Sequence, residues 1–313
     1  MEYRRLGSSG LQVSTVGLGT NNFGKRLDAK QTAAVIDQAL DVGINFLDSA
    51  NAYSAGLSEK YIGQTLKGKR SKAIVATKVS SPMGTGPNSS GNSRQHIMAE
   101  VENSLQRLGT DYIDLYQVHW WDPNTPVEET LRTLDNLVRQ GKIRYMAASN
   151  LCGWQLAQYL YLADAKLYSR FISLQPVYNA LNRSAELEVL PLCEDQHLGV
   201  IPYNPLAGGV LTGKYDRDKE LPAGSRLDGY EQYRNRYLND QMFDLVSDVG
   251  SYDKFLPWVS AIRVRSQSDT EMVADMIVGF KGLRETFTSK VKMERPEHIH
   301  VEYVDGPMKY LHN

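Results

Sequence analysis

Apolar residues gather in short continuous runs along the first two thirds of the chain, and an amphipathic stretch follows most of them. Continuous apolar runs are typical of β-strands that are buried on both faces, as in a parallel sheet. Strands that alternate with helices indicate βα units. We therefore expect seven strands, at 14–20, 44–49, 73–79, 112–119, 143–150, 173–179 and 199–206, and helices that include 29–42, 94–108 and 127–140.

Seven such units within about 240 residues favour a closed barrel over an open sheet, since eight βα units make a TIM barrel. The predicted fold class is α/β, of the (β/α)8 TIM-barrel type, with an eighth unit that is incomplete or substituted. Ahead of the first unit, residues 3–6, 7–10 and 11–13 predict a small hairpin that would cover the barrel floor.

The pattern changes after about residue 240. Strict alternation of apolar and polar residues at 298–304, and two apolar runs that flank a polar turn at 266–269, predict antiparallel hairpins. We expect a barrel domain at 1–239 and a C-terminal antiparallel α+β segment at 240–313, whose elements are a short helix at 241–248, strands at 262–265, 272–278 and 298–304, and an apolar run at 308–311.

Composition excludes several classes of function. The formal net charge of -1 gives no basic surface for nucleic acid. No apolar run approaches the ~18 residues of a membrane helix, and the polar N-terminus lacks the apolar core of a signal peptide. Cys152 and Cys193 have no metal-binding or redox spacing. We expect a cytoplasmic protein without a metal, a membrane partner or a nucleic-acid partner; the oligomeric state is open.

Polar residues stand at or near the ends of consecutive predicted strands. Strand C-termini in a βα barrel share one mouth, so these side chains should converge. A buried polar group costs free energy unless it is paired, which makes a repeated pattern informative. The residues are Asp48, Lys78, His119, Ser149, Asn150, Gln175 and Tyr203.

The chemistry of four residues fits carbonyl reduction. Tyrosine is a weak acid, with an ordinary pKa of about 10, but a nearby lysine cation lowers that pKa, and a carboxylate keeps the lysine charged. Tyr53, Lys78 and Asp48 could form such a relay, and His119 could orient a carbonyl oxygen. Hydride transfer requires a cofactor, because no side chain donates hydride.

These residues lie in segments that resemble the aldo-keto reductase family over about residues 2–238. The segments are GINFLDSANAY at 43–53, Ser58-Glu59, Gly63, ATK at 76–78, DLYQVH at 114–119, ASN at 148–150 and LQPVYN at 174–179. The resemblance implies an NADPH-dependent reductase of aldehydes or ketones, with NADH also possible as the cofactor. It implies Asp48, Tyr53, Lys78 and His119 as the catalytic tetrad.

The resemblance also implies the cofactor site. Ser149, Asn150 and Gln175 would bind the nicotinamide carboxamide, and Tyr203 would stack on the nicotinamide. Segment 204–215 is similar to the loop that covers the pyrophosphate in that family. The remaining implied cofactor residues are Gly19, Thr20, Asn204, Pro205, Leu206, Gly208, Gly209, Lys214 and Arg226.

Structural interpretations stand beside these. Asn150 and Gln175 could be buried hydrogen-bonding residues that hold loops, and Gly208-Gly209 could be an ordinary turn. Trp120 and Trp121 either pack at the barrel mouth or wall the substrate pocket.

The last 74 residues resemble a second family, the ubiquinone-binding START-like proteins related to polyketide cyclases, in truncated form. Two joined, truncated modules imply a fusion that lacks the first family's final strand and its motif for the adenosine phosphate. The tail either supplies a makeshift eighth unit, through 259–264, or folds as a separate antiparallel piece. We favour the separate piece.

Three functions compete. The first is reduction of a small-molecule carbonyl compound. The second is a nicotinamide-binding sensor or channel-associated subunit without significant turnover. The third is binding of a hydrophobic ligand, such as a quinone or a polyketide, by the C-terminal segment. The full tetrad favours the first function.

Overall fold

The computed structural model describes residues 1–215, 220–229, 231–237, 249–254, 259–268, 270–280, 283–294 and 298–305. The chain divides into two compact units. The first comprises Met1–Pro176 and Ser184–Tyr203, and the second comprises Val177–Arg183 and Asn204–Asn313.

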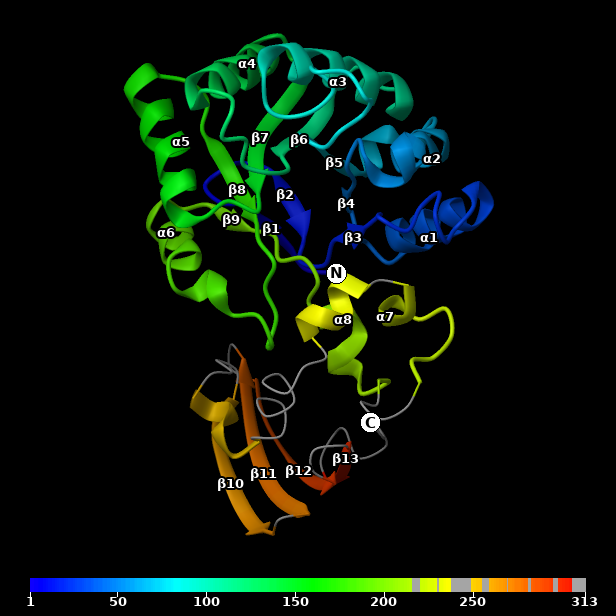
Figure 1. Cartoon of the computed structure of the whole chain (residues 1–313), viewed down its shortest axis with the longest axis vertical. Coiled ribbons are helices and arrows are strands. Elements are labelled where there is room, and N and C mark those ends of the chain that lie inside the picture. Colours follow the sequence, from blue (N-terminus) through cyan, green and yellow to red (C-terminus); the bar gives the residue numbers. More distant parts are fainter. Residues whose placement is uncertain are drawn as a thin grey trace. The chain divides into compact units, whose positions relative to one another are not determined.

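A seven-stranded parallel sheet forms the centre of the first unit, in the order β3-β4-β5-β6-β7-β8-β9. The sheet is curled, and helices α1 to α6 lie along its outer side (Figure 1). Its strands are β3 (Leu18–Gly19), β4 (Phe46–Asp48), β5 (Ile74–Val79), β6 (Ile113–Val118), β7 (Ile143–Ser149), β8 (Phe171–Gln175) and β9 (Gly199–Val200). Its helices are α1 (Ala29–Asp41), α2 (Leu57–Leu66), α3 (Arg94–Leu108), α4 (Val127–Arg139), α5 (Gly153–Lys166) and α6 (Val189–Asp195), with short 3-10 turns η1 (Tyr53–Gly56), η2 (Arg70–Lys72) and η3 (Ser184–Glu186).

The predicted barrel-type fold is confirmed, with corrections at the edges of the sheet. The strands predicted at 14–20 and 199–206 shrink to two residues each. Pro202 and Pro205 explain the second case, because proline has no N–H to donate to a sheet ladder. Over the described residues, the sheet begins at β3 and ends at β9, without an eighth parallel strand.

Capping residues fix where the helices begin and end. Asp28 accepts a hydrogen bond from the amide of Gln31, whose side chain bonds back to Asp28, and this capping box begins α1. Ser93 caps the start of α3, and Gly109, with a φ of 61°, ends it. The predicted helix 94–108 therefore has the same bounds in the structure.

The predicted N-terminal hairpin is also confirmed, as β1 (Tyr3–Arg5) paired with β2 (Gln12–Ser14). Its Leu6 and Val13 side chains join a buried cluster with residues of the sheet, namely Phe46, Ala76, Leu115 and Ala147. Gly7, with a φ of 60°, lies so close to the backbone of Ile172 that a Cβ would collide with it. The hairpin thus closes the interior of the sheet on the side where the strands begin.

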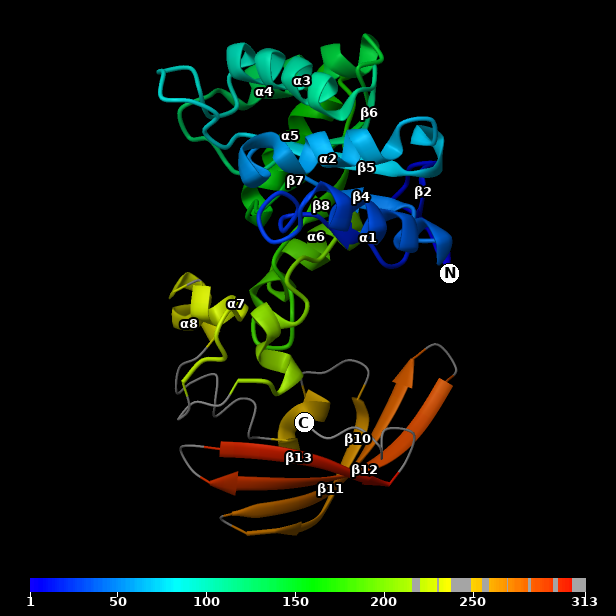
Figure 2. The same ribbon diagram turned by 90° about the vertical axis from the view of Figure 1, so that its right-hand side faces the viewer.

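The second unit holds a four-stranded antiparallel sheet, visible in Figure 2. The predicted strands at 262–265 and 272–278 are confirmed and pair as a hairpin. The predicted strand at 298–304 is also confirmed. The helix predicted at 241–248 and the apolar run at 308–311 lie outside the described residues. The sheet consists of β10 (Val259–Gln267), β11 (Glu271–Phe280), β12 (Leu283–Glu294) and β13 (His298–Asp305); the other elements are η4 (Ala207–Thr212), α7 (Arg226–Gly229), α8 (Glu231–Tyr237) and η5 (Val249–Lys254).

Strand β10 contains the segment that could have been an eighth barrel strand. It pairs antiparallel with β11, with Ile262 opposite Met276. The segment therefore belongs to a hairpin, as favoured from the sequence. Strand β12 was not predicted, because charged and threonine residues interrupt its few apolar positions.

Candidate active site

The Lys78 ammonium lies at the centre of a cluster where β4 and β5 end. Lys78 is fully buried, and its Nζ donates to Asp48 Oδ1 and Oδ2, at 2.9 and 2.8 Å, and to the carbonyl oxygen of Ser49, at 2.7 Å. Burial lowers the pKa of Lys78, but Asp48 and then Tyr53 oppose this and raise it above its ordinary value. Lys78 is therefore a buried cation with an ion-pair partner.

Tyr53 begins the 3-10 turn η1 that follows β4. Its hydroxyl lies 3.4 Å from Lys78 Nζ. The next three residues, Ser54, Ala55 and Gly56, all have positive φ angles, of 53°, 52° and 90°. Consecutive left-handed residues are costly for any residue except glycine, so surrounding contacts must hold this turn in place.

Helix α3 supplies those contacts. Asn51, ahead of the turn, donates to Glu100 at 2.8 Å, and Glu59, behind it, accepts from Arg107 at 2.6 Å. The Arg107 side chain fills the space that a Cβ on Gly56 would occupy. The two carboxyl groups are almost completely buried. This ionic network fixes both ends of the segment that carries Tyr53.

His119 follows β6 and faces the same cluster. Its ring packs edge-on against Tyr53, with 6.0 Å between centroids, and stacks on Trp120 at 4.9 Å. Burial, and then the Lys78 charge, lower the pKa of His119 to about 3. The imidazole is therefore neutral at physiological pH, with one N–H donor and one acceptor.

Two glutamines complete the surroundings of Asp48. Gln117 Nε2 and Gln175 Nε2 each lie 3.0 Å from Asp48 Oδ1. The sequence predicts Gln175 as a ligand of the nicotinamide carboxamide, and Gln117 is not among the predicted site residues. The available signal was position, because Gln117 lies two residues before His119 and so on the same face of β6.

Residues at the ends of β3 and β7 border this cluster. Gly19 is paired with Asp48 in the sheet, and the Thr20 hydroxyl donates to the Asp48 carbonyl at 2.9 Å. The Ser149 hydroxyl donates to the carbonyl of Gln175 at 2.8 Å. All three residues therefore lie beside the strand ends that carry Asp48 and Gln175.

Asn150 connects three parts of the mouth. Its Nδ2 donates to the carbonyl of His119 at 3.1 Å, and its Oδ1 accepts from Tyr203 Oη at 2.8 Å. Its φ of 55° lies in the left-handed region, which asparagine tolerates better than most residues. The structure thus brings Tyr203, Asn150 and His119 together.

The two neighbouring tryptophans, Trp120 and Trp121, have different surroundings. Trp120 is 47% exposed and stacks on His119. Trp121 packs edge-on against Trp154 and Tyr159 of α5. Trp120 therefore borders the tetrad, whereas Trp121 has the contacts of a packing residue.

The other predicted cofactor residues, from Asn204 to Arg226, belong to the second unit. Within that unit, the amides of Gly208 and Gly209 donate to Asn204 Oδ1 and to the carbonyl of Leu206. Lys214 Nζ and the Arg226 guanidinium lie over tyrosine rings, at 5.0 and 5.1 Å. Pro205 precedes Leu206 in the turn before η4. These contacts are compatible with an ordinary turn at Gly208-Gly209. They are equally compatible with a cofactor-binding loop.

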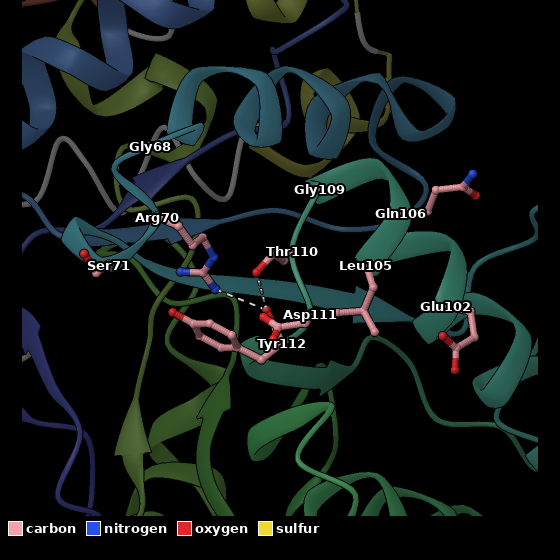
Figure 3. A pocket seen from close by; sticks show the side chains of 10 residues that line it. All are labelled: Gly68, Arg70, Ser71, Glu102, Leu105, Gln106, Gly109, Thr110, Asp111 and Tyr112. Atoms are coloured by element: carbon pink, nitrogen blue, oxygen red, sulfur yellow. Dashed lines mark hydrogen bonds between the residues drawn. The ribbon is translucent and has the colours of Figure 1, made fainter.

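A hollow of about 920 Å³ lies elsewhere on the first unit (Figure 3). Its lining includes Arg70, whose guanidinium lies over the Tyr112 ring at 4.4 Å. The lining segments precede β5 and β6, whereas Lys78 and His119 stand where these strands end. Active sites of βα barrels lie at the strand C-termini, so this hollow is separate from the tetrad.

Two further expectations concern metals and membranes. Among the described residues, no three His, Cys, Asp or Glu side chains are grouped so that they could hold a metal ion. No helix in the described ranges is both long and apolar enough to cross a bilayer.

Comparison with known proteins matches the two parts of the chain to different families. Residues 15–261 match the aldo/keto reductase family, and residues 238–313 match the family described as polyketide cyclase / dehydrase and lipid transport. An uncharacterized oxidoreductase, YrpG, of Bacillus subtilis is 39% identical over 275 residues, which are 83% of this chain and 84% of that protein. The versiconal hemiacetal acetate reductase of Aspergillus parasiticus is 37% identical, over 67% of this chain and 69% of its own.

Some similar proteins are named as channel subunits. A probable voltage-gated potassium channel subunit beta of Arabidopsis thaliana is 37% identical, over 80% of this chain and 77% of its own.

Proposed function

The chain belongs to the aldo/keto reductase family, and we propose that it reduces an aldehyde or ketone to an alcohol with NADPH. One observation carries this proposal. The buried Lys78 ammonium contacts Asp48, Ser49 and the Tyr53 hydroxyl at the same time. A cation beside a phenol favours its ionised form, which is the property needed in a tyrosine that gives up a proton.

Each member of the tetrad has a defined part in the proposed reaction. Tyr53 Oη holds the proton that passes to the carbonyl oxygen as negative charge develops there. Lys78 stabilises the phenolate that remains, and Asp48 holds Lys78 in place and charged. His119, as a neutral imidazole, donates an N–H to the carbonyl oxygen and orients it.

The polar groups at the mouth fit a nicotinamide. Ser149, Asn150 and Gln175 present hydroxyl and amide groups that match the donor and acceptor atoms of a carboxamide, and the Tyr203 ring is joined to Asn150. The cofactor, when bound, supplies the hydride. The motif for the adenosine phosphate is missing, so we expect weaker binding than is usual in the family and little preference for NADPH over NADH.

Trp120 is the side chain we assign to the substrate pocket. It is half exposed and stacks on His119, beside the position of the carbonyl group. An exposed indole face fits an apolar or aromatic aldehyde.

The test is consumption of NADPH with an aromatic aldehyde such as 4-nitrobenzaldehyde. We expect turnover by the wild-type chain and a loss of ~10²-fold or more in kcat for Tyr53→Phe, the scale of general acid catalysis. Cofactor binding, measured by fluorescence quenching, should persist. Tyr161→Phe is the control, since Tyr161 is 74% exposed on α5. Equal kcat for both variants would remove Tyr53 from the mechanism.

The similarity to a channel beta subunit supports a second candidate, a cofactor-binding subunit without significant turnover. Tight NADPH binding with no consumption across a panel of aldehydes and ketones would favour it. A third candidate is binding of a hydrophobic ligand by the C-terminal segment, supported by its match to a lipid-transport family. Binding of a long-chain quinone to the full chain, and its loss on deletion of 240–313, would support that candidate.

A further inference from the structure

Gln117 is the residue that this structure adds to the site. It lies on β6, and its backbone is paired with that of Lys78 on β5. Neighbouring residues in register on parallel strands project to the same face of the sheet. The Gln117 side chain is fully buried. It therefore lies in the interior of the barrel, beside Lys78.

In the part of the chain that the structure describes, the Gln117 side chain makes one hydrogen bond, to Asp48, and leaves its other polar atom unpaired. Its Nε2 donates to Asp48 Oδ1 at 3.0 Å. Its Oε1 is buried, and within the described residues it has no hydrogen-bond partner. An unsatisfied buried acceptor costs about 1–3 kcal/mol. A leucine would avoid this cost, so Gln117 is a poor choice for stability alone.

Gln175 also donates to Asp48 Oδ1, yet its position is different. Gln175 is an expected ligand of the nicotinamide carboxamide, so its amide faces two competing acceptors. Among the described residues, the Gln117 side-chain amide donates to Asp48 alone. A donor that serves Asp48 in the presence and absence of cofactor is therefore available from β6.

We propose that Gln117 is a positioning residue that holds the Asp48 carboxylate with both of its oxygens on Lys78, and so keeps Lys78 within reach of Tyr53. The proposal rests on the proposed function of the tetrad. Its physical basis is that an N–H donor to a carboxylate makes a charge-assisted bond, which is shorter and stronger than a neutral one. Three donors from β5, β6 and β8 then define the carboxylate's orientation.

The test is a double-mutant cycle between Gln117→Leu and Asp48→Ala in the full chain. We expect Gln117→Leu to lower kcat by about 10-fold, on the scale of a hydrogen bond to a charged group, with little change in KM. In the Asp48→Ala background the same substitution should cause no further loss, because the group on which Gln117 acts is gone. Equal losses in both backgrounds, or wild-type kcat for Gln117→Leu, would overturn the proposal.

Two further variants guard the interpretation. Gln117→Met keeps the length of the side chain and replaces Leu if that variant fails to fold. Tyr116→Phe is the matched control, since Tyr116 is the adjacent residue on β6, is fully buried, and has a hydroxyl without a hydrogen-bond partner among the described residues. It faces away from Asp48, and we expect its kcat to be that of the wild type.

A second measurement separates this proposal from the proposed function. The same cycle is run on melting temperatures, which need no substrate. Shifts for Gln117→Leu and Asp48→Ala that are less than additive support a coupling between the two side chains, whereas additive shifts contradict it. If the wild-type chain consumes no NADPH with any carbonyl compound, the proposed function fails, and the melting-temperature cycle still decides the coupling.

Discussion

The Tyr53 hydroxyl and the Lys78 ammonium lie 3.4 Å apart, and the remaining contacts of that ammonium are to Asp48 and to a backbone carbonyl. At this distance the ammonium acts on the phenol through its charge more than through a strong hydrogen bond. The distance from Lys78 to Tyr53 is therefore the quantity that the surrounding residues must control.

Replacing Lys78 by methionine should change the pH dependence of the reaction. Without the cation the phenolate loses its stabilisation, so the alkaline limb of the kcat–pH profile should move to higher pH. Residual turnover is measured between about pH 6 and pH 10, where tyrosine and lysine ordinarily titrate at the upper end. A profile that coincides with the wild type would show that Lys78 does not act on Tyr53.

Burial of His119 as a neutral group should make stability depend on pH. The pKa of this imidazole is about 3 in the folded chain and about 6.5 when it is unperturbed. Between these values the unfolded chain binds the extra proton, so stability should fall as pH drops from about 6.5 toward 3. Urea unfolding at several pH values should show a smaller loss for His119→Asn than for the wild type. His197→Asn is the control at an exposed position, and the same reduction there would contradict the assignment.

The ionic network behind Tyr53 should matter for both stability and catalysis. Arg107→Met leaves the buried carboxyl group of Glu59 without its cation, which typically costs about 3–5 kcal/mol. Urea unfolding should show this loss, and kcat should fall because the turn at Tyr53 loses its support. Adding Glu59→Gln should restore part of the stability.

Lys166→Met is the matched control for Arg107→Met. Lys166 pairs with Glu128 at the surface, where both side chains are about half exposed. Exposed pairs contribute about 0–1 kcal/mol, so this variant should unfold almost like the wild type. Equal effects of the two substitutions would mean that the Arg107 network is not a special support.

Deletion of residues 240–313 should leave cofactor binding nearly intact. The hydrogen bonds that join Asn150, Tyr203, Gln175 and Asp48 all lie within the first unit. We expect a change in the Kd of NADPH of about two-fold or less, which is well below the tenfold that corresponds to 1.4 kcal/mol. Loss of folding or of NADPH binding in the shortened chain would show that the C-terminal segment is part of the barrel.

The sequence predicted the elements whose pattern is local. The run at 112–119 is mostly apolar and appears as β6, and the start and end residues Ser93 and Gly109 locate α3. The run at 199–206 was overestimated because its apolar residues are interrupted by prolines that cannot join a ladder. Strand β12 was missed because its pairing with β11 and β13 stabilises a segment whose own pattern is weak.

The sequence predicted which residues form the candidate site better than it predicted the hydrogen bonds between them. Asp48, Lys78 and His119 stand at successive strand ends, which predicts that they meet at one mouth of the barrel. In the structure Lys78 contacts Asp48, and His119 packs against Tyr53 beside them. The hydrogen bond from Gln117 to Asp48 spans 69 residues, and no local pattern specifies the partner of a buried amide. Lys214, in the loop after η4, and Arg226, at the start of α7, have contacts with tyrosine rings that the sequence did not indicate.

Three donors bond to one oxygen of Asp48, and their positions along the chain determine when during folding the carboxylate can be fully held. Gln175 lies 127 residues after Asp48, and Gln117 lies 69 residues after it. Contacts of such long sequence separation form late, because the loop between the partners must close first. During synthesis, the Asp48 carboxylate therefore stays incompletely held until β8 has left the ribosome and joined the sheet. A partly made chain would contain three members of the tetrad in β4, η1 and β5, yet would lack the structure that aligns them.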